Sequence, residues 1–95
     1  MYPILNNDLM TVSYNGKSNR LTPKEFGILE FLMQNPNKTF SPEEIYENVW
    51  EEKPFACQPI IAVHLRHVRE KLEDDPSKPK LIKSLWGRGY RFVQS

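Results

Sequence analysis

Two histidines and one cysteine are the side chains of this sequence that most directly suggest catalysis or metal binding. His64 and His67 are three positions apart, so both fall on one side of a helix, and Cys57 precedes them. Zinc sites and cysteine–histidine nucleophiles use these residue types. However, no fourth ligand and no orienting carboxylate stands at the spacing that such a site needs. We therefore expect no catalytic residue, no metal site and no cofactor, and we expect His64 to be a packing or hydrogen-bonding residue.

Basic side chains suggest a different chemistry, because they gather on one side of the segment 59–72. Successive residues of a helix are turned by about 100°. One face then carries the apolar residues Ile61, Leu65, Val68 and Leu72, and the other side carries Val63, Arg66, His67, Arg69 and Lys71. Arginine pairs with two atoms of a guanine edge, and a valine methyl contacts the methyl group of thymine. This face is typical of a helix in a DNA major groove, although many amphipathic helices have a solvated polar face that binds nothing.

A second basic segment follows this helix directly. Residues 76–95 contain five bases and no acid. Arg88 stands between two glycines at the tip of an expected hairpin, and Lys80, Lys83 and Arg91 stand on its arms. Such a hairpin can bind phosphates or enter a minor groove. We expect the aromatic residues Trp86, Tyr90 and Phe92 to belong to the core and to hold the hairpin onto the helices.

The distribution of charge favours a polyanionic partner. The formal net charge of +1 conceals a net −3 in residues 1–63 (five bases, eight acids) and a net +4 in residues 64–95 (eight bases, four acids). Five glutamates without a base lie in residues 43–52. A basic C-terminal third suggests nucleic acid as the partner. Two solvated faces of opposite sign would give the same distribution, so charge alone leaves both interpretations open.

Length and composition restrict the classes of protein to consider. With 95 residues, 39% of them apolar and 26% charged, the sequence predicts one globular domain over residues 1–95. The longest apolar runs, such as residues 60–63, are far shorter than the roughly 20 residues of a membrane-spanning helix. Residues 1–5 do not resemble a signal peptide, and a single cysteine fits a reducing compartment. We therefore expect a cytoplasmic protein with no membrane partner.

The order of secondary structure predicts an α+β fold. Residues 4–5, 9–14 and 17–21 favour antiparallel strands, with Asn15-Gly16 as a hairpin turn, so a sheet is expected over 1–21. Helices are expected to begin after Thr22 and Ser41, where a proline and then a glutamate complete a capping box. With a third helix from 59 to 72 or 73, they form a core over 22–74. Strands at 80–86 and 90–94 flank the loop Gly87-Arg88-Gly89, which makes a terminal hairpin over 80–94.

Several segments in this order and spacing resemble the C-terminal effector domain of OmpR/PhoB-type bacterial response regulators. They are Leu21–Phe26, Phe40–Ile45, Val63–Leu72, Asp75-Pro76 and Gly87–Phe92, and the similarity extends from about residue 4 to 94. The resemblance implies a winged helix–turn–helix fold with an N-terminal four-stranded sheet, three helices and a C-terminal β-hairpin wing. It also implies sequence-specific binding of double-stranded DNA in a two-component phosphorelay, with the recognition helix in the major groove and the wing in the minor groove.

The resemblance also implies which residues contact DNA and the transcription machinery. Base contacts are expected from Ala62, Val63, Arg66, His67 and Arg88, and phosphate contacts from Arg69, Lys71, Lys83 and Arg91. The loop from Trp50 to Gln58 touches RNA polymerase in this family, which points to Trp50, Glu51, Glu52, Lys53 and Phe55.

Three positions depart from the family pattern. Many members have an aspartate at the position of Ala62 and an arginine at the positions of His67 and Trp86. The base preference should therefore differ, and Arg88 is expected to replace the usual arginine of the wing. The Trp-Gly-x-Gly-Tyr pattern of residues 86–90 resembles a subset that includes vancomycin-resistance regulators.

The implied partners are direct-repeat DNA half-sites bound by a head-to-tail homodimer, and an RNA polymerase subunit. A sensor histidine kinase is implied only through a receiver domain, whose acidic pocket this sequence lacks, so an excised domain and a stand-alone regulator both stay open. A winged helix that binds only proteins of the transcription machinery is the alternative, favoured by the acidic segment 43–52. The acid-free segment 76–95 favours DNA.

Overall fold

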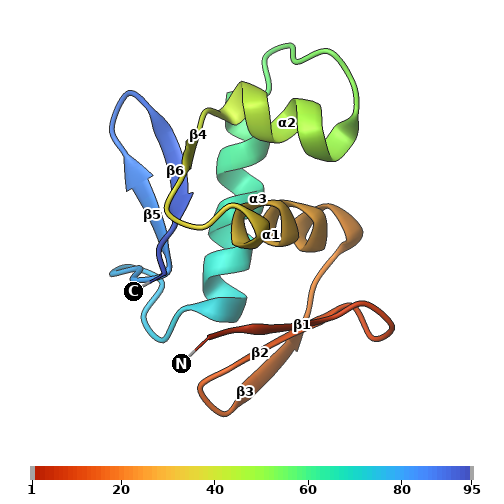
Figure 1. Cartoon of the computed structure of the whole chain (residues 1–95), viewed down its shortest axis with the longest axis vertical. Coiled ribbons are helices and arrows are strands. Elements are labelled where there is room, and N and C mark those ends of the chain that lie inside the picture. Colours follow the sequence, from red (N-terminus) through yellow and green to blue (C-terminus); the bar gives the residue numbers. More distant parts are fainter. Residues whose placement is uncertain (1, 95) are drawn as a thin grey trace.

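The computed structural model of the chain describes residues 2–94 (Figure 1), so Met1 and Ser95, the ends of the predicted domain, lie outside the described residues. It begins with an antiparallel sheet of β1 (Ile4–Asn6), β2 (Thr11–Tyr14) and β3 (Lys17–Arg20), in that order. The expectation of four strands is wrong for this part of the chain. Asn6 Oδ1 accepts the Leu9 N–H at 3.0 Å and Met10 has a φ of 55°, so residues 7–10 form a turn between β1 and β2.

Two helices begin at the predicted capping boxes. Helix α1 spans Pro23–Gln34 and α2 spans Pro42–Trp50. At α1 the Glu25 N–H donates to Thr22 Oγ1 at 3.3 Å, and the Thr22 N–H donates to Glu25 Oε1 at 3.0 Å. Ser41 and Glu44 form the same pair of bonds at α2. These bonds satisfy N–H groups that the first turn of a helix leaves without partners, which confirms both predicted starts.

Helix α3 (Gln58–Leu72) provides the centre of the core. Its apolar face of Ile61, Leu65, Val68 and Leu72 is completely buried, which confirms the predicted periodicity. Facing it are other buried side chains from every part of the chain: Val12, Leu21, Ile28, Leu29, Leu32, Ile45, Ile82 and Phe92. The side of α3 opposite this stripe is therefore the side that faces solvent.

The C-terminal hairpin is shorter than predicted and has a third strand. Strands β5 (Ile82–Leu85) and β6 (Gly89–Phe92) pair, and β4 (Thr39–Phe40) adds to β6, in the order β4-β6-β5. A two-residue strand such as β4 is too short to show a periodicity in the sequence. Gly89 pairs with Leu85, so the loop consists of residues 86–88, one position earlier than expected.

The close approach of β4 and β6 requires glycine at position 89. Gly89 has a φ of 141°, and a Cβ at this position would overlap the carbonyl group of Phe40. The wing formed by β5 and β6 is thereby fixed to the segment that precedes α2.

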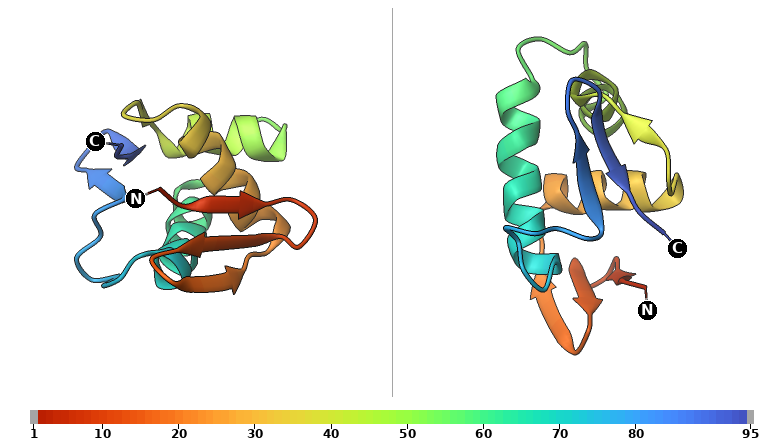
Figure 2. Two further views of the ribbon diagram at one scale, coloured as in Figure 1. Left: turned by 60° about the horizontal axis from the view of Figure 1, so that its bottom comes forward. Right: turned by 90° about the vertical axis from the view of Figure 1, so that its left-hand side faces the viewer.

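The arrangement of the elements brings the tip of the wing and the start of α3 to one end of the molecule (Figure 2). The wing runs beside α3, and its tip lies toward the end where α3 begins. The N-terminal sheet lies at the other end, where Asn19 Nδ2 donates to the carbonyl oxygen of Lys71 at 2.9 Å. Over residues 2–94, no helix is both long and apolar enough to span a membrane.

Candidate nucleic-acid interface

The middle of α3, from residue 62 to residue 66, presents exposed side chains to solvent. Ala62 and Arg66 are exposed, and Val63 is 47% exposed although it is a large apolar residue. They lie opposite the buried residues Ile61 and Leu65 on the same turns. The structure thus brings together a methyl group, a branched apolar side chain and a guanidinium group, which is the set of groups that reads base edges.

Further along α3, His67 and Lys71 contact a buried carboxylate that the sequence reasoning missed. Glu25 is 3% exposed, and its carboxylate lies 2.7 Å from Lys71 Nζ and 3.5 Å from His67 Nδ1. Burial raises the pKa of Glu25, but the bonds from Lys71 and from the Thr22 N–H lower it by more, so it lies below the ordinary value of 4.5. The sequence marked Glu25 only as a capping residue, and its contact with α3 is a tertiary one.

Arg69 does not present a free cation as expected. Its Nε and Nη2 donate to the carbonyl oxygen of Ile82 at 3.2 and 3.0 Å, and Nη2 also donates to Ser84 Oγ at 2.8 Å. The guanidinium group lies over the Tyr90 ring at 5.8 Å, and burial lowers its pKa. Arg69 therefore joins α3 to β5 rather than extending toward solvent.

Arg91 is occupied in the same way. Its Nε and Nη2 donate to Thr39 Oγ1 at 3.0 and 2.9 Å, so it joins β6 to β4. Of the four expected phosphate ligands, Lys83 is exposed, whereas the other three are half-buried.

Glu73 fixes the linker between α3 and the wing, and nothing in the sequence pattern had indicated it. The side chain is 2% exposed and accepts the backbone N–H groups of Lys80, Leu81 and Ile82 at 2.8–3.1 Å. These bonds occupy the N–H groups of residues 80–82, while the Leu81 carbonyl oxygen still accepts the Val93 N–H at 2.7 Å, and β5 begins at Ile82, later than predicted. The position of the wing relative to α3 thus depends on one buried carboxylate.

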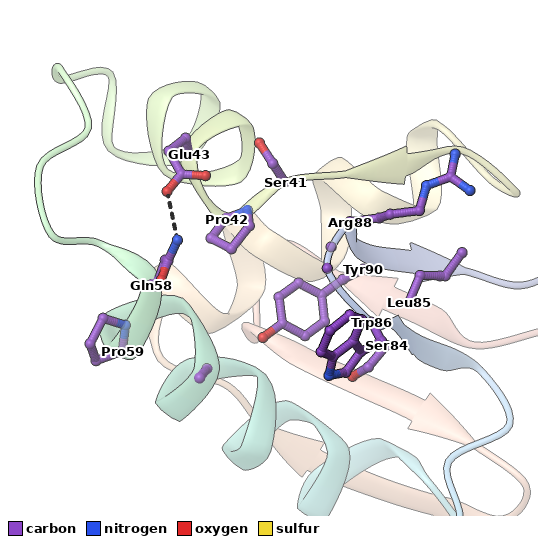
Figure 3. Close-up of a pocket in the computed structure, with 13 residues that line it drawn as sticks. Ser41, Pro42, Glu43, Gln58, Pro59, Ser84, Leu85, Trp86, Arg88 and Tyr90 are labelled. Carbon is purple, nitrogen blue, oxygen red and sulfur yellow. Dashed lines mark hydrogen bonds between the residues drawn. The ribbon is translucent and has the colours of Figure 1, made fainter.

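The wing tip and the starts of α2 and α3 enclose an open groove of about 580 Å³ (Figure 3). Ala62 and Pro59 line one side, and Trp86, Arg88 and Tyr90 line the other. The prediction for the aromatic residues was right for Phe92, which is buried, but wrong for Trp86, which is 98% exposed. Tyr90 is half-buried. The turn of residues 86–88 places Trp86 beyond the reach of the core.

The loop between α2 and α3 divides into a packed and an exposed part. Trp50 is half-buried and stacks on Tyr46, with 4.7 Å between ring centroids, and Lys24 Nζ lies 5.2 Å from the Trp50 ring. The expected polymerase contacts Glu51, Glu52, Lys53 and Phe55 are exposed, Phe55 by 87%.

His64 is a packing residue, as the sequence suggested. Its Nδ1 lies 2.7 Å from the carbonyl oxygen of Ile60, and its ring meets the edge of Trp50 at 5.2 Å. Cys57 is buried at the start of α3. Among residues 2–94, no three side chains of the metal-ligating types histidine, cysteine, aspartate and glutamate form a group that could hold an ion.

Comparison with known sequences connects this geometry to a family. A family model described as "Transcriptional regulatory protein, C terminal" matches residues 16–92. Over 85 residues, the chain is 49% identical to the uncharacterized transcriptional regulatory protein YcbL of Bacillus subtilis. Over 75 residues it is 44% identical to the regulatory protein VanRc of Enterococcus gallinarum. The matches cover 90% and 79% of this chain but only 38% and 32% of those relatives.

Solved structures show the same fold. The response regulator DrrB of Thermotoga maritima, described as an OmpR/PhoB homolog, has 34% identity and a TM-score of 0.81, over 97% of this chain and 42% of DrrB. The DNA-binding domain of CpxR from E. coli has 30% identity and a TM-score of 0.77, over 96% of this chain and 89% of that domain. The predicted winged-helix fold is thereby confirmed.

Proposed function

The chain belongs to the C-terminal effector domains of OmpR/PhoB-type transcriptional regulatory proteins, and we propose that it recognises its DNA through α3 and the wing. The observation that carries this proposal is that the start of α3 lies beside the wing tip at one end of the molecule, with Val63 and Arg66 exposed on that helix and Trp86 and Arg88 exposed on the wing. We propose the whole of residues 1–95 as one such DNA-binding domain, working in the cytoplasm, where a bacterial chromosome is accessible.

The exposed residues in the middle of α3 are proposed to read the major groove. Arg66 is the residue with the donors for a guanine edge, and Val63 offers methyl groups to thymine. Ala62 and His67 flank them. The exposure of Val63 supports this assignment, because an apolar side chain in the centre of a solvated face gains a partner when DNA covers it.

The wing and the lysines are proposed to bind the DNA backbone and the minor groove. Arg88 at the wing tip reaches the minor groove, and Lys83 on β5 binds phosphate. Lys71 has a side chain that is 31% exposed and is proposed to serve both Glu25 and a phosphate. Arg69 and Arg91 have most of their donors engaged within the fold, so we propose that they position the wing rather than bind phosphate.

The remaining partners are proposed from the family. We propose that the chain binds direct-repeat half-sites as a head-to-tail pair, and that a sensor histidine kinase acts on it only through a receiver domain of a longer regulator. The matches span 38% and 32% of the length of the two relatives, which is compatible with this proposal. The exposed Phe55 beside Glu51, Glu52 and Lys53 supports a protein contact, for which an RNA polymerase subunit is the proposed partner. These residues do not line the groove between α3 and the wing, so we propose that the two contacts coexist.

Selection from a random duplex library tests the proposal. We expect recovery of a direct repeat with half-sites about one helical turn apart, and an affinity for it that falls steeply with salt concentration. A pool that shows no enrichment after selection, with weak binding that disappears at moderate salt, would contradict sequence-specific recognition by this domain.

A further inference from the structure

The wing carries one side chain that the fold does not explain. Trp86 is 98% exposed, whereas its neighbours on the hairpin are half-buried (Tyr90) or fully buried (Phe92). A single exposed aromatic residue is ordinary on a protein surface. Trp86 differs because its backbone is held in place and because it borders the groove that faces α3.

The loop that carries Trp86 is rigidly supported. The Arg88 N–H donates to the Leu85 carbonyl oxygen at 2.9 Å, which closes the loop. Directly after it, the contact between Gly89 and the Phe40 backbone fixes β6 against β4. A backbone on such a support loses little freedom when a partner binds, so less of the contact energy of its side chain is offset by ordering of the loop.

The direction of the side chains separates Trp86 from Arg88. Trp86 and Tyr90 both line the groove toward α3, while in Figure 3 the guanidinium of Arg88 extends away from α3. When α3 occupies a major groove, the DNA backbone that separates the two grooves runs between α3 and the wing. A side chain on the α3 side of the wing, such as Trp86, would then face the wall of the minor groove, which is formed by deoxyribose.

We propose that Trp86 is a DNA-contacting residue whose indole packs against the deoxyribose wall of the minor groove and contributes affinity that does not depend on salt. This inference rests on the proposed function. The indole faces are apolar and match the C–H groups of the sugars, and the indole N–H can donate to adenine N3 or thymine O2 at the floor. A tryptophan thus occupies a wing position at which a charged residue would bind by ion pairing. Because its N–H can donate to adenine N3 or thymine O2, we expect it to prefer A·T base pairs.

A matched pair of wing variants distinguishes an apolar contact from an ionic one. We expect Trp86→Ala to weaken binding to a single half-site duplex about tenfold at every salt concentration, with an unchanged slope of log K against log salt. We expect Arg88→Ala to reduce that slope by about 0.9, the value for one lost phosphate-type contact. Trp86→Phe should keep most of the affinity, because it keeps an apolar ring.

Tryptophan emission gives a second readout. Binding of the duplex should change the emission of the wild-type protein, and the change should be absent in Trp86→Phe, in which Trp50 is the remaining tryptophan. Because Trp86 is exposed, its variants should melt at the wild-type temperature, so a loss of binding will not reflect unfolding.

Three outcomes would overturn the inference. Equal affinity of Trp86→Ala and the wild type for the half-site refutes it while the proposed function stands. A loss confined to cooperative binding on a tandem site would assign Trp86 to a contact between two protein copies instead. Failure of the wild type to prefer any duplex would overturn both the inference and the function on which it rests.

Discussion

Helix α3 divides into a free half, residues 58–66, and an anchored half, residues 67–72, which use similar residues for opposite purposes. Arg66 at the end of the free half is exposed, whereas Arg69, about one turn later, is half-buried and bonded to Ile82 and Ser84. The difference lies in what surrounds each residue, since β5 supplies hydrogen-bond acceptors to Arg69 while the side chain of Arg66 faces solvent. A basic residue on a helix face is therefore no measure of a DNA contact until its tertiary partners are known.

The anchored half of α3 holds the helix against the wing and against α1, and so sets the position of the free half. Arg69 and Glu73 both bind the segment that leads into the wing, and Lys71 binds α1 through Glu25. The contacts of Arg69 and Glu73 fix the start of β5 against the end of α3, and thereby the place of the wing beside the helix. The comparison predicts that changes in the anchored half alter stability and that changes in the free half alter binding.

The largest expected effect is that of Glu73→Gln on stability. The substitution keeps the size of the side chain but replaces the charged acceptor and introduces an amide donor opposite three backbone N–H groups. Loss of charge-assisted bonds in a buried position should lower the free energy of unfolding by about 3 kcal/mol. Chemical denaturation measures this value, and Glu70→Gln on the exposed side of the same helix is the matched control. Equal midpoints for the two variants would show that the carboxylate does not hold the linker.

The second largest effect is expected on DNA affinity, from a substitution in the free half of α3. Arg66→Ala should weaken specific binding by about 1–3 kcal/mol and relax the preference at one base position, without changing the melting temperature. Competition binding with specific and random duplexes measures both quantities. An equal loss on the two duplexes would make Arg66 a phosphate contact and would remove it from base recognition.

The sequence predicted local features of the fold but not the contacts between distant elements. Local signals were sufficient for the capping boxes at Thr22 and Ser41 and for the buried stripe of α3, because each depends on residues three or four positions apart. The roles of Glu25, Arg69 and Glu73 depend on contacts between distant elements, such as Glu25 with Lys71.

The wing illustrates the same limit. An aromatic residue in a hairpin usually packs inside, but the register of β5 and β6 places Trp86 in the loop and Phe92 in the core. A shift of one position in the predicted loop was enough to misplace one aromatic side chain of the three. The family resemblance located the interface, but the division of α3 into free and anchored halves required the structure.

A smaller effect is expected from Arg69→Ala, and it separates the two arginines directly. Removal of the guanidinium leaves the Ile82 carbonyl oxygen and the Ser84 hydroxyl without this partner, which should lower the free energy of unfolding by about 1–2 kcal/mol. The slope of log K against log salt should stay close to that of the wild type. A decrease of the slope by about 0.9, at unchanged stability, would instead restore Arg69 as a phosphate ligand.

The smallest expected effect is the contribution of Glu25 to stability as a function of pH. Because the pKa of Glu25 in the folded protein is below its ordinary value of 4.5, the unfolded state binds the proton more readily. The stabilisation is therefore complete above the unfolded pKa and is lost as the pH falls through the folded pKa. Glu25→Gln should lower the free energy of unfolding by about 1 kcal/mol at neutral pH, and this deficit should shrink in acid. Urea denaturation at neutral pH and at successively lower pH measures it, with Glu70→Gln as the control. A deficit that stays constant in acid would mean that the substitution acts through packing or the helix cap rather than through the charge shared with Lys71 and His67.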